Sequence, residues 1–144
     1  MYPLDLSESL VPPQDDDVVL ETTVGDLLRQ TAADRVLPAA ADADLGVLNG
    51  WSIMRGWLTG TPLEQIAPRD KWSDDQQRAE VMRLWCEEHG VTLLSLALQF
   101  CLREARIHGN PVGNLNVQQL EANVAAASKP LTDEVIEAFQ AAAL

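Results

Sequence analysis

The sequence predicts an α/β fold that is predominantly helical and is preceded by an acidic N-terminal extension. Three observations lead to this prediction. Apolar residues recur at helical spacing over most of the second half of the chain. Two short apolar runs have the length of buried strands. Negative charge is concentrated at the start of the chain. With 144 residues, the chain fits one domain with a real hydrophobic core.

The formal net charge is −12, and it is unevenly distributed. Residues 1–44 contain ten acidic and two basic side chains, whereas residues 45–144 contain twelve and eight. This excess argues against nucleic acid or an anionic membrane as the main partner. The sequence after Met1 does not resemble a signal peptide, and no apolar run is long enough to cross a membrane, so we expect a cytoplasmic protein. We divide the chain into an extension, 1–44, and a second unit, 45–144.

Within the extension, residues 1–21 are rich in proline and aspartate and predict an extended lead. A helix is predicted over about 24–34, because apolar and small residues follow two threonines at helical spacing. Residues 36–44 have low complexity and are the predicted boundary. Residues 22–35 weakly resemble the first helix of acyl-adenylate-forming ligases, a match that includes nothing catalytic.

The second unit opens on a predicted strand. Residues 45–49 are apolar, short and bounded by glycine, as is typical of a buried strand. Gly56, Gly60 and Pro62 then predict a loop. A second, weaker strand is predicted over 107–112, where one glycine and one proline interrupt the apolar residues.

Four helices complete the prediction. The first runs over 73–89, begins at a serine cap and ends before a glycine. The second, 92–104, is apolar almost all round and must therefore be buried. The last two cover 116–127 and 132–143, and Thr132 is the predicted cap of the second. The order strand, loop, helix, helix, strand, helix is that of the last units of a (β/α)8 barrel, so the predicted fold is a partial barrel.

The candidate site lies where the third of these helices begins. Gly113 makes a turn, Asn116 caps the helix, and the helix presents free N–H groups and its positive end to an anion. A purely structural alternative exists for the same residues. Asn116 and Gln119 have the spacing of a capping box, which stabilises a helix by roughly 1 kcal/mol without any ligand.

Residues 45–140 resemble the C-terminal third of the aldo-keto reductases, most closely the sugar-lactone-forming galactose and arabinose dehydrogenases. Four pieces carry the resemblance in the family's order. The segment Gly50–Gly60 is similar to the family's seventh-strand segment, and Glu88–Phe100 is similar to its helix rich in alanine and leucine. The segment Pro111–Gly113 is similar to the eighth strand. The segment Asn114–Asn123 is similar to the turn and helix that hold the adenosine end of NADP.

The resemblance implies a nicotinamide cofactor, NADP or NAD. The family usually has a glutamate where Ala122 stands and often a basic residue where Gln119 stands, so the choice between the two cofactors is open. The turn proline of the family is also replaced, by Ser52 or Ile53. The implied cofactor-binding residues are Ser52 and Met54 near the pyrophosphate, Gly113 in the turn, Asn114, Asn116 and Gln119 at the adenosine phosphate, and Asn123 at the adenine.

The resemblance also shows what the sequence lacks. In the family a tyrosine activated by a lysine, which pairs with an aspartate, works beside a histidine. The single tyrosine here is Tyr2, in a proline-flanked tail, and the two lysines are Lys71 and Lys129. No catalytic residue is therefore assigned, and we leave open whether the chain is an enzyme.

Two further groups of residues, a possible metal-binding pair and the four tryptophans, each have a functional and a structural interpretation. Cys86 and His89 have the spacing of two metal ligands on a helix. The favoured interpretation is a half-buried thiol beside a solvated histidine, and no metal site is assigned. The four tryptophans suit stacking on a cofactor or covering the edge of the core. An incomplete barrel exposes strand edges and the helix 92–104, so a second copy, another subunit or the folded-back extension is expected to cover them.

Three interpretations follow. The first is a cofactor-binding remnant of an aldo-keto reductase, inactive alone and dependent on a partner or on self-association. The second is a non-enzymatic interaction or dimerisation protein. The third is a truncated or fused gene product, joined near residue 40.

Overall fold

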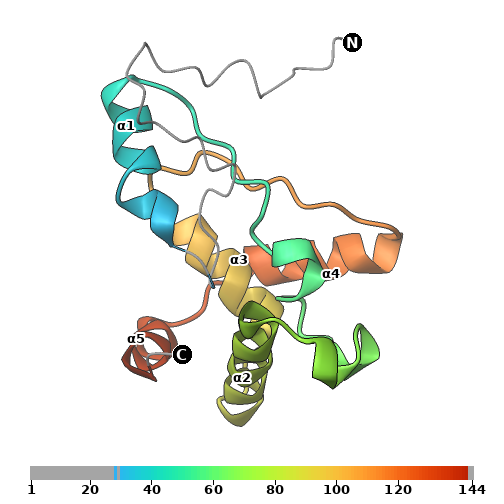
Figure 1. Cartoon of the computed structure of the whole chain (residues 1–144). Helices are drawn as coiled ribbons and strands as arrows, with labels where there is room; N and C mark the ends of the chain where they lie inside the picture. Colours follow the sequence, from blue (N-terminus) through green and yellow to red (C-terminus); the bar gives the residue numbers. More distant parts are fainter. Residues whose placement is uncertain (1–27, 29, 143–144) are drawn as a thin grey trace.

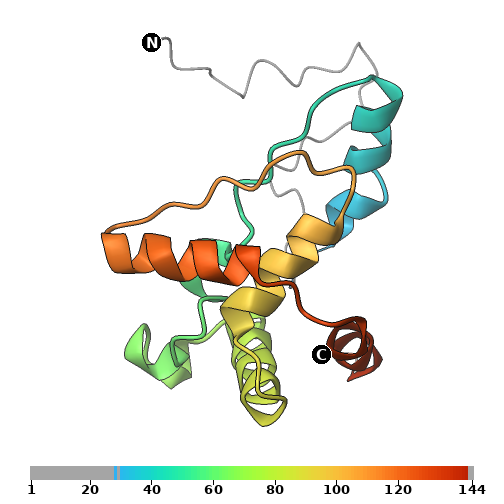
Figure 2. The ribbon, with the colours of Figure 1, turned by 180° about the vertical axis from the view of Figure 1, so that it is seen from behind.

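The computed structural model describes residues 28 and 30–142, and its regular structure is helical (Figure 1). Helix α3 lies in the middle, with α1, α2, α4 and α5 extending around it; the reverse view shows the same arrangement (Figure 2). The elements are α1 (Val36–Asp42), α2 (Asp74–Glu88), α3 (Leu93–Arg103), α4 (Val117–Ser128) and α5 (Asp133–Ala142), with short 3₁₀ turns at Thr31–Ala33, Met54–Gly56, Leu63–Gln65 and Arg69–Lys71.

The helices predicted over 73–89, 92–104, 116–127 and 132–143 are confirmed as α2, α3, α4 and α5. Local sequence signals explain why these predictions succeed. Ser73 and Gln76 form a reciprocal capping box at the start of α2. The same helix ends in a Schellman motif, in which Gly90 adopts a φ of +68° and its N–H bonds the carbonyl of Glu87.

The extension differs from its prediction. Most of the helix predicted over about 24–34 lies outside the described residues, and its described end holds only the 3₁₀ turn Thr31–Ala33. The α-helix begins later, at Val36, in the stretch predicted to be a joint. Three consecutive alanines favour a helix there, and Pro38 is tolerated because it stands in the first turn, where its missing N–H has no intrahelical partner.

The two predicted strands are not found in the described part of the chain. Residues 45–49 and 107–112 nevertheless lie side by side, joined by one isolated parallel bridge between Leu48 and Gly109. Two paired segments without a third strand are marginal on their own. Pro111 removes a further backbone donor from the second segment. The order of the two segments is therefore as predicted, whereas the predicted sheet is reduced to a single bridge in the described part of the chain.

Two clusters of buried side chains hold the molecule together. The larger joins α2, α3 and α5 to the loop before α2, and its fully buried members include Leu58, Leu63, Met82 and Leu96. The smaller contains Leu37, Ala40 and Val47, with Ile107 packed against them. It thus draws residues from both sides of the predicted boundary after residue 44, and the division into two units stays a prediction.

Helix α3 is buried on most but not all of its surface. Its buried residues include Leu93, Leu96, Ala97 and Leu98, whereas Leu102 keeps 48% of its surface exposed. Among the residues that the structure describes, no helix has both the length and the apolar character needed to span a bilayer.

Candidate functional site

The predicted site at the start of α4 is built from side-chain amides. Asn116 is the N-cap, with extended backbone angles, and its Oδ1 accepts from the Gln119 N–H at 2.9 Å. Gln119 reaches back, and its Oε1 accepts from the Leu115 N–H at 2.8 Å. These bonds resemble a capping box, although the glutamine bonds the residue before the cap. The capping prediction for Asn116 is confirmed.

A second pair of bonds closes the turn before the helix. Asn123 Nδ2 donates to Asn114 Oδ1 at 2.7 Å, and Asn114 Nδ2 donates to the Val112 carbonyl at 2.9 Å. The structure therefore brings together four of the predicted residues, namely Asn114, Asn116, Gln119 and Asn123. Gly113, also predicted, is exposed in the same turn.

The electrostatics of this turn come from backbone rather than from side chains. Between Gly113 and Asn123 the only charged residue is Glu121. An α-helix leaves its first four N–H groups without intrahelical partners, and the Asn116 cap satisfies one of them. The helix end keeps its partial positive charge and suits an anion.

Ser52 and Met54, the other predicted residues, are buried in a different turn. Ser52 as a residue is 2% exposed, and its hydroxyl donates to Asn110 Oδ1 at 2.8 Å. Met54 packs into the large core cluster, so only its backbone is available for a ligand. Asn110 precedes Asn114 by four residues and thereby ties this turn to the segment that leads into α4.

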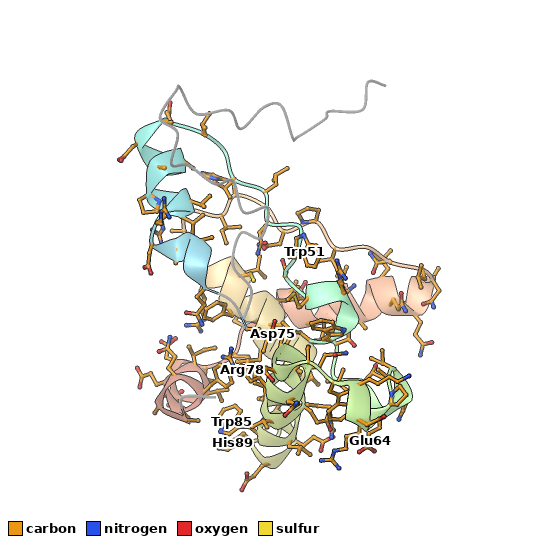
Figure 3. The ribbon with its side chains drawn as sticks, in the orientation of Figure 1. Trp51, Glu64, Asp75, Arg78, Trp85 and His89 are labelled. Atoms are coloured by element: carbon orange, nitrogen blue, oxygen red, sulfur yellow. The ribbon has the colours of Figure 1, made fainter. Side chains whose placement is uncertain are left out.

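The backbone of this turn is unusual. The φ values of Met54, Arg55 and Gly56 are 43°, 54° and 90°. These lie in the left-handed region, which disfavours every residue that has a Cβ atom. The guanidinium of Arg55 lies 5.1 Å from the centre of the Trp51 ring. Figure 3 labels Trp51 on this turn. Arg55 is a cation in the turn expected to face the pyrophosphate, although it is not among the residues predicted from the sequence.

Asn49 was also missed. It is fully buried, its Nδ2 donates to Cys101 Sγ at 3.5 Å, and its Oδ1 accepts from the Trp51 N–H at 3.3 Å. It thereby connects α3 to the turn that contains Ser52. A polar residue at the end of an apolar run, just before a glycine, was the available signal.

The remaining candidate residues have structural contacts of their own, and Cys86 is more deeply buried than the half-buried thiol that was expected. Cys86 is buried, and burial raises the pKa of its thiol to about 12. The His89 ring instead stacks on Trp85 with ring centres 3.8 Å apart (Figure 3). Among the described residues no cluster of three metal-ligating side chains exists. All four tryptophans pack against the large core cluster, as the covering interpretation expects.

One cavity of the described structure lies away from the predicted site. A cavity of about 310 Å³ opens between α1, α3 and α5, with Leu37, Phe100 and Ile136 in its wall. None of the predicted cofactor-binding residues lines it.

Comparison with known proteins identifies the family and the fold. The model of the aldo/keto reductase family matches residues 15–143. An aldo-keto reductase from Bacillus halodurans, solved in its holo form, is similar with a TM-score of 0.58 and 24% identity over 76% of this chain and 37% of that one. A glycerol dehydrogenase from Gluconobacter oxydans gives a TM-score of 0.60 and 19% identity over 79% of this chain and 38% of that one. The curated proteins include no match. The chain thus spans well under half the length of these structures.

Proposed function

Because the chain belongs to the aldo/keto reductase family, we propose that it is a cofactor-binding part of such an oxidoreductase, which binds NADP or NAD at the turn before α4. The observation that carries the proposal is the bond between Asn123 and Asn114, which holds the turn against the helix end. That the similar reductase from Bacillus halodurans was solved in its holo form is consistent with this assignment.

The residues of the turn before α4 and of the Ser52 turn fit a nicotinamide dinucleotide. An amide side chain has two donor hydrogens and an acceptor oxygen, and Asn123 uses one donor hydrogen on Asn114. The rest of its amide is left for an adenine edge. The helix end suits a phosphate, and Arg55 supplies a positive charge in the other predicted turn. With no basic side chain between Gly113 and Asn123, the choice between NADP and NAD stays open.

The architecture proposed for the whole is a partial (β/α)8 barrel. Its support is the parallel bridge between Leu48 and Gly109, which pairs the two segments expected to be the last strands. The comparisons cover 37% and 38% of the similar structures, which accords with a fragment of about this size.

We propose that this part does not catalyse a reaction by itself. Lys71 lies in an exposed 3₁₀ turn and Lys129 follows the end of α4, so neither shares the candidate site with another of the family's catalytic residue types. The sequence has one tyrosine, Tyr2, which lies outside the described residues.

A partner is the third part of the proposal. Four apolar side chains at the start of α4 or along it are exposed, namely Leu115 (93%), Val117 (69%), Leu120 (48%) and Val124 (55%). Val117, Leu120 and Val124 follow one another at intervals of three and four residues, so they form one stripe on the helix. A second copy of the chain or another subunit would bury this stripe.

One observation favours the alternative of a non-enzymatic interaction protein. Hydrogen bonds within the turn and the start of the helix already use polar atoms of Asn114, Asn116 and Gln119. The same bonds would form in a purely structural cap. The apolar stripe beside them would then be the functional surface.

The deciding experiment is a calorimetric titration of the chain with NADPH and with NADH. We expect micromolar binding that weakens about tenfold or more in Asn123→Ala, because the turn loses its tie to the helix. Gln118→Ala, an exposed change on the same helix, is the matched control and leaves affinity unchanged. Circular dichroism checks that both variants keep α4. The absence of binding up to millimolar cofactor would refute cofactor binding by the isolated chain.

The partner proposal needs a separate measurement, sedimentation velocity over a range of concentrations. Association that is lost in Leu120→Asp but kept in Leu84→Asp, an equally exposed leucine on α2, supports the stripe as the interface. A monomer at every concentration argues against self-association.

A further inference from the structure

Two segments far apart in the sequence, 47–49 and 108–110, are joined by a dense set of hydrogen bonds. The Val47 carbonyl accepts from the His108 N–H at 2.9 Å and from the Gly109 N–H at 3.3 Å, and the Asn49 N–H donates to the Gly109 carbonyl at 2.8 Å. The remaining bond uses a side chain. The Val47 N–H donates to Nδ1 of His108 at 3.1 Å. We call this set of four bonds the junction.

The bond to Nδ1 fixes the protonation state of His108. A neutral imidazole has one N–H and one bare nitrogen, so a ring that accepts through Nδ1 carries its hydrogen on Nε2. Uptake of a second proton places a hydrogen on Nδ1. The Val47 N–H then faces another donor instead of an acceptor, and the bond is lost. Histidine is the side chain that ordinarily changes charge between pH 5 and 8.

We propose that His108 is a pH-sensitive latch, which strengthens the hold of segment 45–49 on segment 107–110 in its neutral form and loosens it on protonation by removing one of the four bonds. The ring is exposed and lines an open hollow of about 250 Å³, so water and protons reach it. The latch acts on this junction whether or not a cofactor binds.

Two charged groups of the described residues share the hollow with the ring. Asp44, at the end of α1, and Arg106 line the same hollow. Arg106 is held by Glu104, whose Oε2 accepts from its Nη2 at 2.6 Å, and it also donates to the Ala33 carbonyl. Segments 45–49 and 109–112 contain no ionisable side chain. Asp44 is therefore the remaining carboxylate that lines the hollow.

Release of the junction reaches the candidate site through named contacts. Asn49 sits inside the junction, and its carbonyl lies 3.3 Å from the Ser52 hydroxyl. Ser52 in turn donates to Asn110, the residue after Gly109. The junction and the Ser52 hydroxyl thus share Asn49 and the residue next to Gly109. His108 is thereby linked through these contacts to the turn that carries Ser52.

The test is nuclear magnetic resonance of the full chain, labelled with ¹⁵N. At pH 8 the ring of His108 is expected to show a bare Nδ1 and a protonated Nε2. Between pH 8 and pH 5 the protection factor of the Val47 amide falls about five- to tenfold, the loss expected for one hydrogen bond. A neutral ring with its hydrogen on Nδ1, or a Val47 amide whose protection does not change, overturns the proposal.

Two substitutions separate the latch from other titrations. His108→Asn keeps an acceptor near the position of Nδ1 but does not titrate, so the Val47 amide stays protected at pH 5. His89→Asn changes the only other histidine and leaves the response of Val47 intact. A response that persists in His108→Asn overturns the proposal, and the measurement on the unmodified chain decides it if that variant does not fold.

Discussion

The Asn123 side chain donates from Nδ2 to Oδ1 of Asn114 at 2.7 Å, so a residue in the second turn of α4 is bonded to the turn before the helix. This bond and the Asn116 cap make the turn and the start of the helix one unit. The unit has little support from the core, since Ala126 is the only buried residue of α4.

Asn116→Ala tests how much the cap contributes. Loss of the bond to the Gln119 N–H is expected to lower the free energy of opening α4 by about 1 kcal/mol. Amide hydrogen exchange of residues 119–123 measures this directly. Gln118→Ala serves as control. Equal exchange in the variant and the unmodified chain would mean that the cap is not needed.

Gly90→Ala tests the end of α2. Gly90 has a φ of +68°, and a side chain in this left-handed conformation costs roughly 1–2 kcal/mol. We therefore expect the free energy of unfolding in urea to fall by about that amount. Gly113→Ala is the matched control, because a Cβ there meets no atom within 4 Å and its φ is not positive. Similar losses in both variants would contradict this explanation.

Glu104→Gln tests the ion pair with Arg106. Hydrogen bonds from the Arg106 side chain and N–H lower the pKa of the Glu104 carboxyl to about 2, from an ordinary value of 4.5. A carboxyl with a lowered pKa stabilises the fold above its unfolded-state pKa, and this contribution is lost as the pH falls from about 4.5 towards about 2.

Urea unfolding at pH values from 7 to 2 measures the effect. The unmodified chain is expected to lose stability more steeply between pH 4.5 and 2 than Glu104→Gln, which is already less stable at neutral pH. Glu121→Gln, on the exposed side of α4, is the control. Parallel curves for Glu104→Gln and the unmodified chain would show that the pair contributes nothing.

The thiols give a prediction about reactivity. Cys86 and Cys101 are both about 1% exposed, and burial raises the pKa of Cys86 to about 12. The thiolate is the reactive form, so Cys86 is expected to resist alkylation at pH 8 until the chain unfolds. Mass spectrometry after timed exposure to iodoacetamide, with and without urea, measures this. Rapid labelling of Cys86 in the folded chain would be inconsistent with its burial.

The helices and their caps followed from the sequence because the signals are local. Ser73, Thr92 and Asn116 each cap a helix within three residues of themselves. The polar start of the helix that Asn116 caps was predicted in the same way, whereas the roles of Asn114 and Asn123 were implied by the resemblance to the reductases. Helix α1 was not predicted, because a short run of alanines beside aspartates fits a low-complexity joint as well as a helix.

The strands and the second turn depended on contacts that no local signal encodes. Residues 45–49 have the composition of a buried strand, but a sheet needs neighbours, and the described chain supplies a single parallel bridge. The left-handed backbone of Met54 and Arg55 also has no local sequence signal. The bonds from Ser52 to Asn110 and from Val47 to His108 join positions that sequence spacing does not relate.

By itself, then, the sequence determined the helix positions, the caps and the resemblance to a reductase, because these rest on neighbouring residues. Only the tertiary structure decided that Asn49 and His108 tie the two apolar segments together, because hydrogen bonds between residues some 50 to 60 positions apart depend on how the chain packs.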